Sequence, residues 1–476
     1  MKLTKTIVAA NSNLAGQKVN TIAALPSRTA VSYILLFATS VLLYGAMWQS
    51  APLMTEDSPA YLRAAQDLSD FQIDQLQIRT PGYPVLLLLT GSGRPLFFTS
   101  LLLHFVSIWL LASVLCRAGL TEWTLNLFAV LLLLPPYVEY AGYVLAEILT
   151  EFMLVAGFVS LVTWFLRRDT AWLIASAGAF AYSGLTRPVY QTLAFALAGG
   201  LLFTPVLFRW LPFKWRDMFM PSLVLTLTTV LVIGGYSYMN YRAHGVFGNN
   251  SYQLAFTLSN KTHRLIERLP DEYSTVRAIL VRNRNANLLK GYSEYAELNY
   301  MHDAIDDLKA ATGLDMPQLS TYLVKLNLLL IVNAPLGYLQ DVLWAFCRYW
   351  FPTSSTLANM NSRSLQYFWG IVHFAIVSVF AINSLLLFAT ATYMMMCQTL
   401  IKTRDKTIIT KLRSNNLQGF LYILAGIIVL YSAFIPCLTG AGEARYRVPT
   451  DSLIVFMCFL GIHLWRRLIT FGKIIV

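Results

Sequence analysis

The sequence predicts an all-α polytopic membrane protein with about ten transmembrane helices, interfacial helices in the first outer loop and a small outer unit. Of its 476 residues, 56% are hydrophobic and only 13% are charged, and the mean hydropathy is +0.55. A soluble chain carries about 25% charged residues. Apolar runs recur from one end of the chain to the other, so a bilayer is the predicted surrounding.

A helix needs about 20 mostly apolar residues to cross roughly 30 Å of hydrocarbon. The candidate spans are Val31 to Trp48, Pro95 to Cys116, Thr124 to Val144, Ile148 to Phe165, Ala171 to Leu185, Tyr190 to Phe208, Met218 to Met239, Phe368 to Cys397, Phe420 to Cys437 and Val448 to Trp465. The first is predicted to be retained, because it is longer than the roughly 7 to 15 apolar residues of a cleavable signal.

Lys and Arg in short loops set the predicted orientation, because they collect on the cytoplasmic side. If the spans alternate, one side receives Lys2, Lys5, Lys18, Arg28, Arg117, Arg167, Arg168, Arg209 to Arg216, Lys402 to Arg413, Arg466, Arg467 and Lys473. We therefore expect a bacterial inner-membrane protein with both termini in the cytoplasm. The same insertion rule accounts for the net charge of +12, so no nucleic-acid partner is predicted.

Three regions follow along the chain. Residues 1–240 form a predicted N-terminal transmembrane catalytic module with a first outer loop at 49–94, and residues 368–476 form the C-terminal transmembrane helices. Between them, residues 241–367 form a predicted outer, periplasmic unit with helical stretches from Asp271 to Lys290 and Tyr295 to Ala311. Leu319 to Phe351 is predicted to form two interfacial helices rather than two more spans, because polar residues recur within it.

The cysteines and histidines do not indicate a disulfide framework or a zinc site. Five cysteines are present without paired spacing, and the histidines are scattered. We expect histidines such as His104 and His373 to serve as hydrogen-bonding residues in helix packing.

An acidic pair, Glu56-Asp57, lies just after the first span. A carboxylate at the membrane rim is well placed to take a proton from a hydroxyl. The pair also precedes Ser58-Pro59, which is a helix-start pattern, so capping of the next helix by Asp57 or Ser58 is an equally weighted alternative.

The loop after this pair resembles that of GT-C glycosyltransferases that use polyprenyl-phosphate sugars, such as protein mannosyltransferases and aminoarabinose transferases. In that superfamily an acidic residue is followed by an amphipathic helix and a return to the membrane at a Pro-Gly-Tyr-Pro-like turn. The corresponding stretches here are Ser58 through Arg63 to Ile78, then Arg79-Thr80-Pro81-Gly82-Tyr83-Pro84.

Four further segments resemble the same superfamily in the same order. They are Leu145-Ala146-Glu147, Leu185-Thr186-Arg187-Pro188, Asn240-Tyr241-Arg242 with Gly245 and Phe247, and Gly442-Glu443-Ala444-Arg445-Tyr446-Arg447-Val448-Pro449. Ala146 and Ile148 stand where the superfamily has a small hydroxyl residue and a proline. The five matches spread from Glu56 to Pro449, and all fall on the predicted outer face.

A sugar on a lipid phosphate is already activated, so the protein must supply a base and a cationic clamp for the phosphate. Asp57, with Glu56 beside it, is the predicted base, and the resemblance implies inversion at the anomeric carbon. The predicted phosphate ligands are Arg187, Arg445, Arg447 and Arg79, and the predicted acceptor or supporting residues are Glu147, Tyr61 and Tyr83. The alternative for Arg187 is snorkelling. The alternative for Arg445 and Arg447 is an ion pair with Glu443 or with an acidic residue of the Tyr241 to Tyr367 unit.

Glu139, Glu147 and Glu151 border the outer ends of the third and fourth spans. They would bind the acceptor, assist the base, or hold a divalent ion with Asp57 as in metal-dependent relatives of the superfamily. Pairing with helix dipoles is the alternative for at least two of them. No obligatory metal or other cofactor is predicted.

The predicted function is transfer of a hexosyl or pentosyl group from a polyprenyl-phosphate donor to a hydroxyl of a glycan, lipid or protein at the periplasmic face, among membrane lipids. A transporter or flippase for a lipid or amphipathic anion is the alternative from another class. It would place charged residues at midspan, where several of these spans have almost none. An O-antigen ligase or polymerase is a further alternative, and it would lack the Glu56-Asp57 pair.

Overall fold

The computed structural model describes residues 25–47, 52–72, 79–207, 215–248, 253–290, 300–360, 362–400 and 406–475. Within these ranges the chain is helical, and an isolated bridge between Leu53 and Tyr143 takes the place of a sheet. The basic residues Lys2, Lys5, Lys18, Arg209 and Lys402, which entered the predicted orientation, lie outside these ranges, as do residues 73–78 of the first outer loop.

The all-α polytopic membrane fold is confirmed. Seven helical stretches among the described residues are long and apolar enough to cross a bilayer, and nine qualify if each of two bent pairs counts as one span. Six of the seven belong to α2 (Ser27–Met47), α5 (Arg94–Arg117), α8 (Glu147–Arg167), α19 (Arg363–Leu400), α20 (Lys406–Thr439) and α21 (Asp451–Ile475). The seventh joins α11 (Trp215–Thr229), a π turn (Val230–Gly234) and α12 (Gly235–His244).

The other three predicted spans are also helical, with differences. The third is α6 (Glu122–Leu132) followed by α7 (Pro135–Val138) and a 3₁₀ turn (Glu139–Gly142), bent by 62° where two prolines follow the end of α6. The fifth and sixth are α9 (Thr170–Thr186) and α10 (Leu193–Leu207), with 17 and 15 residues. α10 is shorter than its predicted run, whereas α9 covers the whole of its own, and both pack against other helices of the bundle.

The bundle core is centred on α8, which lies against α5 and α9. Gly157 of α8 allows the ring of Phe180 on α9 to approach so closely that a Cβ would lie 2.9 Å from it. Ser176 of α9 donates a hydrogen bond of 2.9 Å to the Gly157 carbonyl. In a bilayer the hydrophobic effect does not drive helices together, because lipid tails are as apolar as the side chains. Small residues at such contacts let the helices approach closely, so van der Waals packing stabilises the bundle instead.

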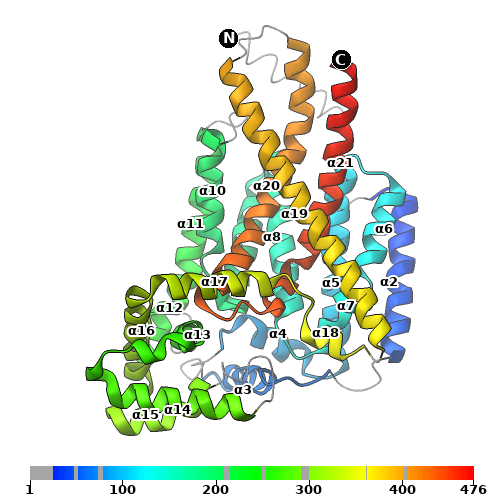
Figure 1. The fold of residues 1–476 in the computed structure, drawn as a ribbon. Helices are drawn as coiled ribbons and strands as arrows, with labels where there is room; N and C mark the ends of the chain where they lie inside the picture. Colours follow the sequence, from blue (N-terminus) through cyan, green and yellow to red (C-terminus); the bar gives the residue numbers. More distant parts are fainter. Residues whose placement is uncertain are drawn as a thin grey trace.

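The outer unit has a separate hydrophobic core. Its helices are α13 (Gln253–Thr262), α14 (Ser274–Lys290), α15 (Tyr300–Thr312), α16 (Met316–Asn333) and α17 (Pro335–Tyr349). α16 and α17 meet at an angle of 102° before Pro335 and together form the second bent pair, so their interfacial placement stays a prediction. In Figure 1 this unit and α3 (Ser58–Ser69) lie at one end of the bundle, opposite the red end of α21.

Candidate active site

Contacts in the first outer loop place Asp57 beside the start of α8. The Leu53 N–H donates 2.7 Å to the Gly142 carbonyl, and the Val144 N–H donates 3.1 Å back to the Leu53 carbonyl. The Ser58 hydroxyl accepts from the Thr55 N–H at 2.8 Å and donates to the Val144 carbonyl at 3.0 Å. The loop is therefore tied to the chain segment that leads directly into Glu147, the first residue of α8.

Asp57 occupies the N-cap position of α3, but its carboxylate makes no capping hydrogen bond. The interpretation of Asp57 as a capping side chain is therefore wrong. One of its carboxylate oxygens binds Arg79, and the other lies 2.7 Å from Nη1 of Arg445. The two arginines compete successfully for the oxygens because an ionised donor binds a carboxylate more strongly than a backbone N–H does.

The turn that carries Arg79 is held against the end of α9. α4 (Gly82–Thr90) begins at Gly82, where a Cβ would lie 2.6 Å from the Leu185 carbonyl oxygen. Tyr182 of α9 donates 2.8 Å to the Gly82 carbonyl. The backbones at Gly82 and Leu185 are too close for a side chain at position 82, so glycine is required there. This contact places the Arg79 turn beside the end of α9 that carries Arg187.

Tyr61 and Tyr83 lie behind Arg79. The guanidinium carbon of Arg79 is 4.5 Å from the centre of the Tyr61 ring, and this ring meets that of Tyr83 edge to face at 4.9 Å. Both tyrosines are buried. They support the arginine by cation–π contact and packing.

Arg445 connects Asp57 to Glu147. Its Nε lies 2.5 Å from Oε1 of Glu147, and the same oxygen lies 3.1 Å from Nη1 of Arg187. Arg187 in turn stacks over the Tyr446 ring at 5.0 Å. We call Asp57, Arg79, Glu147, Arg187 and Arg445 the arginine–carboxylate cluster. It brings together residues from five separate parts of the chain.

The cluster carries more positive than negative charge and has unused polar atoms. Three guanidinium groups face two carboxylates, so an arriving anion would neutralise one excess positive charge. Within the described residues, Oε2 of Glu147 and Nε of Arg79 are buried and lack a hydrogen-bond partner. Buried polar atoms of this kind are unusual in a purely structural network.

Burial alone would raise the pKa of Asp57, but the charges of Arg445 and Arg79 and their hydrogen bonds lower it to about 2. Asp57 is therefore ionised at every physiological pH. An acid this strong is a weak proton acceptor, since a general base works best when its pKa lies near the working pH.

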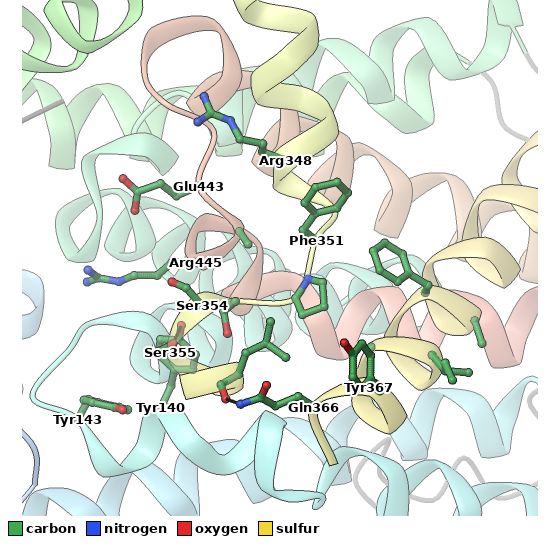
Figure 2. Close-up of a pocket in the computed structure, with 18 of the residues that line it drawn as sticks. Tyr140, Tyr143, Arg348, Phe351, Ser354, Ser355, Gln366, Tyr367, Glu443 and Arg445 are labelled. Atoms are coloured by element: carbon green, nitrogen blue, oxygen red, sulfur yellow. Dashed lines mark hydrogen bonds between the residues drawn. The ribbon is translucent and has the colours of Figure 1, made fainter. Parts of the chain in front are cut away.

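A pocket of about 1110 Å³ opens next to the cluster. Arg445 lines it, together with Glu443 and Arg348 at the same polar end. The other end runs along α19 and is mostly apolar, with Phe351, Gly370, Ile371, Phe374 and Ala375 in its lining. The polar lining residues of α19 include Arg363 and Gln366 in its first turn and Ser378 further along. Figure 2 shows Glu443 and Arg445 extending to the same side, with Tyr367 of α19 across the pocket from them.

Hydroxyl groups also line the pocket. Tyr140, Tyr143 and Ser355 are among the lining residues, and the Tyr140 hydroxyl lies 2.9 Å from the Ser355 hydroxyl. Sequence reasoning missed these residues and the α19 surface. The only available signal was the Tyr-x-x-Tyr spacing after the two prolines of the third span, which is too common to indicate a site.

Arg447 lies elsewhere than predicted. Its Nε binds Asp451 at 2.7 Å, and its Nη1 donates to the carbonyls of Tyr349 and Phe351 at 2.8 and 2.7 Å. Arg447 thus ties the start of α21 to the end of α17, and we leave it out of the proposed phosphate site. Glu56 is exposed and takes part in none of the ion pairs found among the described residues.

Glu139 and Glu151 lie outside the cluster. Glu151 binds Nδ1 of His104 at 2.8 Å, and the other ring nitrogen of His104 lies 2.9 Å from the Leu132 carbonyl. Glu139 accepts a 2.9 Å hydrogen bond from Asn359. The packing role predicted for His104 is confirmed, as is that of His373, which contacts the Trp350 carbonyl at 3.0 Å.

The part of the chain that the structure describes contains no group of three His, Cys, Asp or Glu side chains arranged to hold a metal ion. Asp57 and Glu147 both bind Arg445.

No protein-family model matches this chain, and no curated protein matches it in sequence. Among solved structures, it is similar to the oligosaccharyltransferase AglB from Archaeoglobus fulgidus in complex with an inhibitory peptide and a dolichol-phosphate. The TM-score is 0.46 at 12% identity, over 92% of this chain and 51% of AglB. The chain thus spans about half the length of AglB.

It is also similar to ArnT from Cupriavidus metallidurans. The structure bound to undecaprenyl phosphate gives a TM-score of 0.36 at 13% identity, over 91% of this chain and 77% of ArnT. The apo structure gives 0.35 at the same identity, 13%. Because all three TM-scores lie below 0.5, the function is argued from this chain's own residues.

Proposed function

We propose that this chain is an integral membrane glycosyltransferase that moves a sugar from a polyprenyl-phosphate donor to an acceptor hydroxyl. One observation carries the proposal: a pocket of about 1110 Å³ that begins at Arg445 and continues along the apolar side of α19. A phosphate bound to a long isoprenoid needs this combination of a cationic end and an apolar end. The order of the GT-C-like motifs supports the same conclusion.

Arg445 is the proposed first contact for the donor phosphate. It is the member of the arginine–carboxylate cluster that lines the pocket, and its side chain keeps 27% of its surface exposed, against 10% for Arg187. A guanidinium group can donate two parallel hydrogen bonds to two oxygens of one phosphate. Arg79 and Arg187 stand behind Arg445 and supply further positive charge as the leaving phosphate gains negative charge.

The hydroxyl groups that line the pocket are suited to the sugar. Tyr140, Tyr143 and Ser355 line the same pocket as Arg445, where the donor's sugar would lie beside its phosphate. An acceptor hydroxyl that approaches the anomeric carbon opposite the phosphate would invert that centre. The positive-inside pattern supports a periplasmic position for the site and cytoplasmic termini in a bacterial inner membrane.

The test begins with the purified protein in nanodiscs and a panel of radiolabelled polyprenyl-phosphate hexoses and pentoses. We expect binding of polyprenyl phosphate, measured as a shift in thermal unfolding, and transfer of label to an acceptor present in membrane extracts. Movement of the lipid across vesicle membranes without any sugar transfer would instead establish the transporter alternative.

A substitution in the apolar end of the pocket tests the donor's position. Gly370 lines the pocket, and a Cβ added there meets nothing within 4 Å. Gly370→Phe should fill the groove and weaken polyprenyl phosphate binding about tenfold or more, which is about 1.4 kcal/mol. Gly178→Phe on α9 is the matched control, because its Cβ also meets nothing within 4 Å and it lies outside the pocket. Equal binding by the two variants would contradict the proposed groove.

A further inference from the structure

Glu443 is the only acidic residue among the described residues that line the pocket. Its position is fixed by the residue before it. Gly442 has a φ of +65°, and a Cβ there would lie 2.7 Å from both Cβ and the carbonyl oxygen of Ala345 in α17. Arg348 of α17 also donates 3.2 Å to the Ala441 carbonyl. The loop is therefore pinned to α17, and the Glu443 side chain starts from a defined point.

The Glu443 carboxyl is uncommitted, in contrast to the other acids nearby. Asp57 binds two arginines, and Glu147 binds Arg445 and lies against Arg187. The backbone carbonyl of Glu443 accepts a 3.0 Å hydrogen bond from the Tyr446 N–H, but its carboxyl group takes part in none of the hydrogen bonds or ion pairs found among the described residues. A pocket-lining carboxyl whose oxygens are not engaged by arginines is free to bind a hydroxyl of a ligand.

The electrostatic surroundings of Glu443 also differ from those of Asp57. Burial raises its pKa above the usual range and Asp57 adds to the rise, while Arg445, Arg187 and Arg348 oppose it. These are the charged groups that face Glu443 from α3, α9, α17 and its own loop. The balance moves its pKa towards neutral pH, in the direction that favours a general base, whereas the pKa of Asp57 is lowered to about 2.

We propose that Glu443 is the proton acceptor of the transfer, and that Asp57 serves as the fixed counter-ion that holds Arg79 and Arg445 in place. This inference rests on the proposed function. The acceptor O–H bond breaks, its proton passes to the Glu443 carboxylate, and the oxygen forms a bond to the anomeric carbon. The bond from that carbon to the phosphate oxygen breaks, and its electron pair leaves with the polyprenyl phosphate beside Arg445. Glu443 then releases the proton to water.

Charge movement in the site supports this assignment. Glu443 loses its negative charge as the departing phosphate gains one, and both face Arg445. The total charge around the arginines therefore stays constant through the step, which avoids the cost of building a second negative charge in a partly desolvated site. Asp57, held ionised by its two arginines, would have to give up an ion pair to accept the same proton.

The experiment uses the full-length protein in nanodiscs with a radiolabelled polyprenyl-phosphate sugar that the wild type accepts. Ethanol and trifluoroethanol serve as probe acceptors, since the trifluoroethanol hydroxyl is the more acidic. We expect Glu443→Gln to bind polyprenyl phosphate within about threefold of the wild type and to lose about 10²- to 10⁴-fold in single-turnover rate. Trifluoroethanol should restore more of the rate than ethanol. The rise of rate with pH that we expect for the wild type should disappear in this variant.

Matched variants separate a chemical role from a structural one. Glu443→Asp should recover part of the rate, and Glu122→Gln, an exposed change at the start of α6, should leave it unchanged. A Glu443→Gln rate within about threefold of the wild type, or a loss equal for both alcohols, overturns the assignment while the proposed function stands. If the wild type neither binds polyprenyl phosphate nor transfers sugar, the proposed function falls and this inference falls with it.

Discussion

At the scale of the residue, the site depends on how two arginines occupy one carboxylate. Asp57 binds Arg79 through one oxygen and Arg445 through the other. Removing this carboxylate leaves the two positive charges of Arg79 and Arg445 close together without the negative charge that offsets their repulsion. Buried or partly buried charges that lose their partner are among the costliest changes in a folded protein.

Asp57→Asn is therefore expected to lower the free energy of unfolding by about 1 to 3 kcal/mol at neutral pH. The pKa of Asp57 is lowered to about 2 in the folded protein, from an unfolded value of 3.8. Its stabilisation is therefore complete above about pH 4 and is lost as the pH falls through 2. Thermal unfolding of both proteins across this range measures the difference. A difference that persists unchanged at pH 2 would contradict the ion-pair assignment.

Arg445 tests the geometry of the same cluster. It contacts Asp57 through Nη1 and Glu147 through Nε, which a lysine with one nitrogen cannot do. Arg445→Lys keeps the charge, so we expect an intact fold and a loss of about tenfold or more in polyprenyl phosphate affinity. Arg282→Lys, in an exposed pair with Asp307, is the matched control. Equal affinity in both variants would show that charge alone binds the phosphate.

At the scale of the element, the sequence predicted where the helices run better than where they bend. Each predicted span is a helix because apolar length is a property of one segment alone. The size of the 62° bend at the two prolines after α6, and the shortening of α10, depend on how neighbouring helices pack, which one segment does not encode. The helix predicted from Tyr295 begins in the described part of the chain at Tyr300.

The site also combines residues that motifs indicate with residues that only the packing of the chain brings to it. The motifs indicated Asp57, Arg79, Glu147, Arg187 and Arg445, and the structure brings these five together. Arg447 was grouped with Arg445 by proximity in sequence, but the segment is a 3₁₀ turn in which residues two apart point in different directions. The apolar pocket wall on α19 carries no sequence signal, because a lipid-facing residue and a pocket-lining residue look alike.

A substitution at Gly82 tests whether one close backbone contact positions the turn that carries Arg79. A Cβ there would lie 2.6 Å from the Leu185 carbonyl oxygen, and this atom cannot move without displacing the end of α9. Gly82→Ala should move the Arg79 turn away from Asp57, destabilise the fold by about 1 to 3 kcal/mol and reduce sugar transfer. Gly178→Ala lies in open space and should be neutral or slightly stabilising. Unchanged transfer by Gly82→Ala would show that the turn tolerates displacement.

At the scale of the whole molecule, the outer unit and the bundle meet at the pocket. α17 belongs to the outer unit by sequence, and it packs against α20 and against the loop that carries Glu443 and Arg445. Arg447 fastens the far end of α17 to α21. A shift of α17 would therefore move the loop that carries Glu443, so the attachment of this unit bears directly on the proposed transfer.

Lys261 provides a way to measure how firmly α17 is held to α13 within this unit. It is buried in α13, and its ammonium donates 2.8 Å to the Asp341 carbonyl of α17. Burial lowers its pKa from 10.5 to about 8, with Asp341 opposing the shift. Between these two pH values the folded state binds fewer protons than the unfolded state. The free energy of unfolding should therefore rise with pH from about 8 to about 10.5.

Lys261→Met keeps the length of the side chain and removes the titrating group. We expect the wild type to gain about 1 to 3 kcal/mol relative to Lys261→Met as the pH rises from about 8 to about 10.5. The difference between the two proteins isolates Lys261, because buried tyrosines that also titrate at high pH are common to both. Hydrogen exchange of α13 and α17 amides over the same range would locate the effect. Parallel stability curves would mean that Lys261 holds its proton in the folded protein and that burial does not govern this contact.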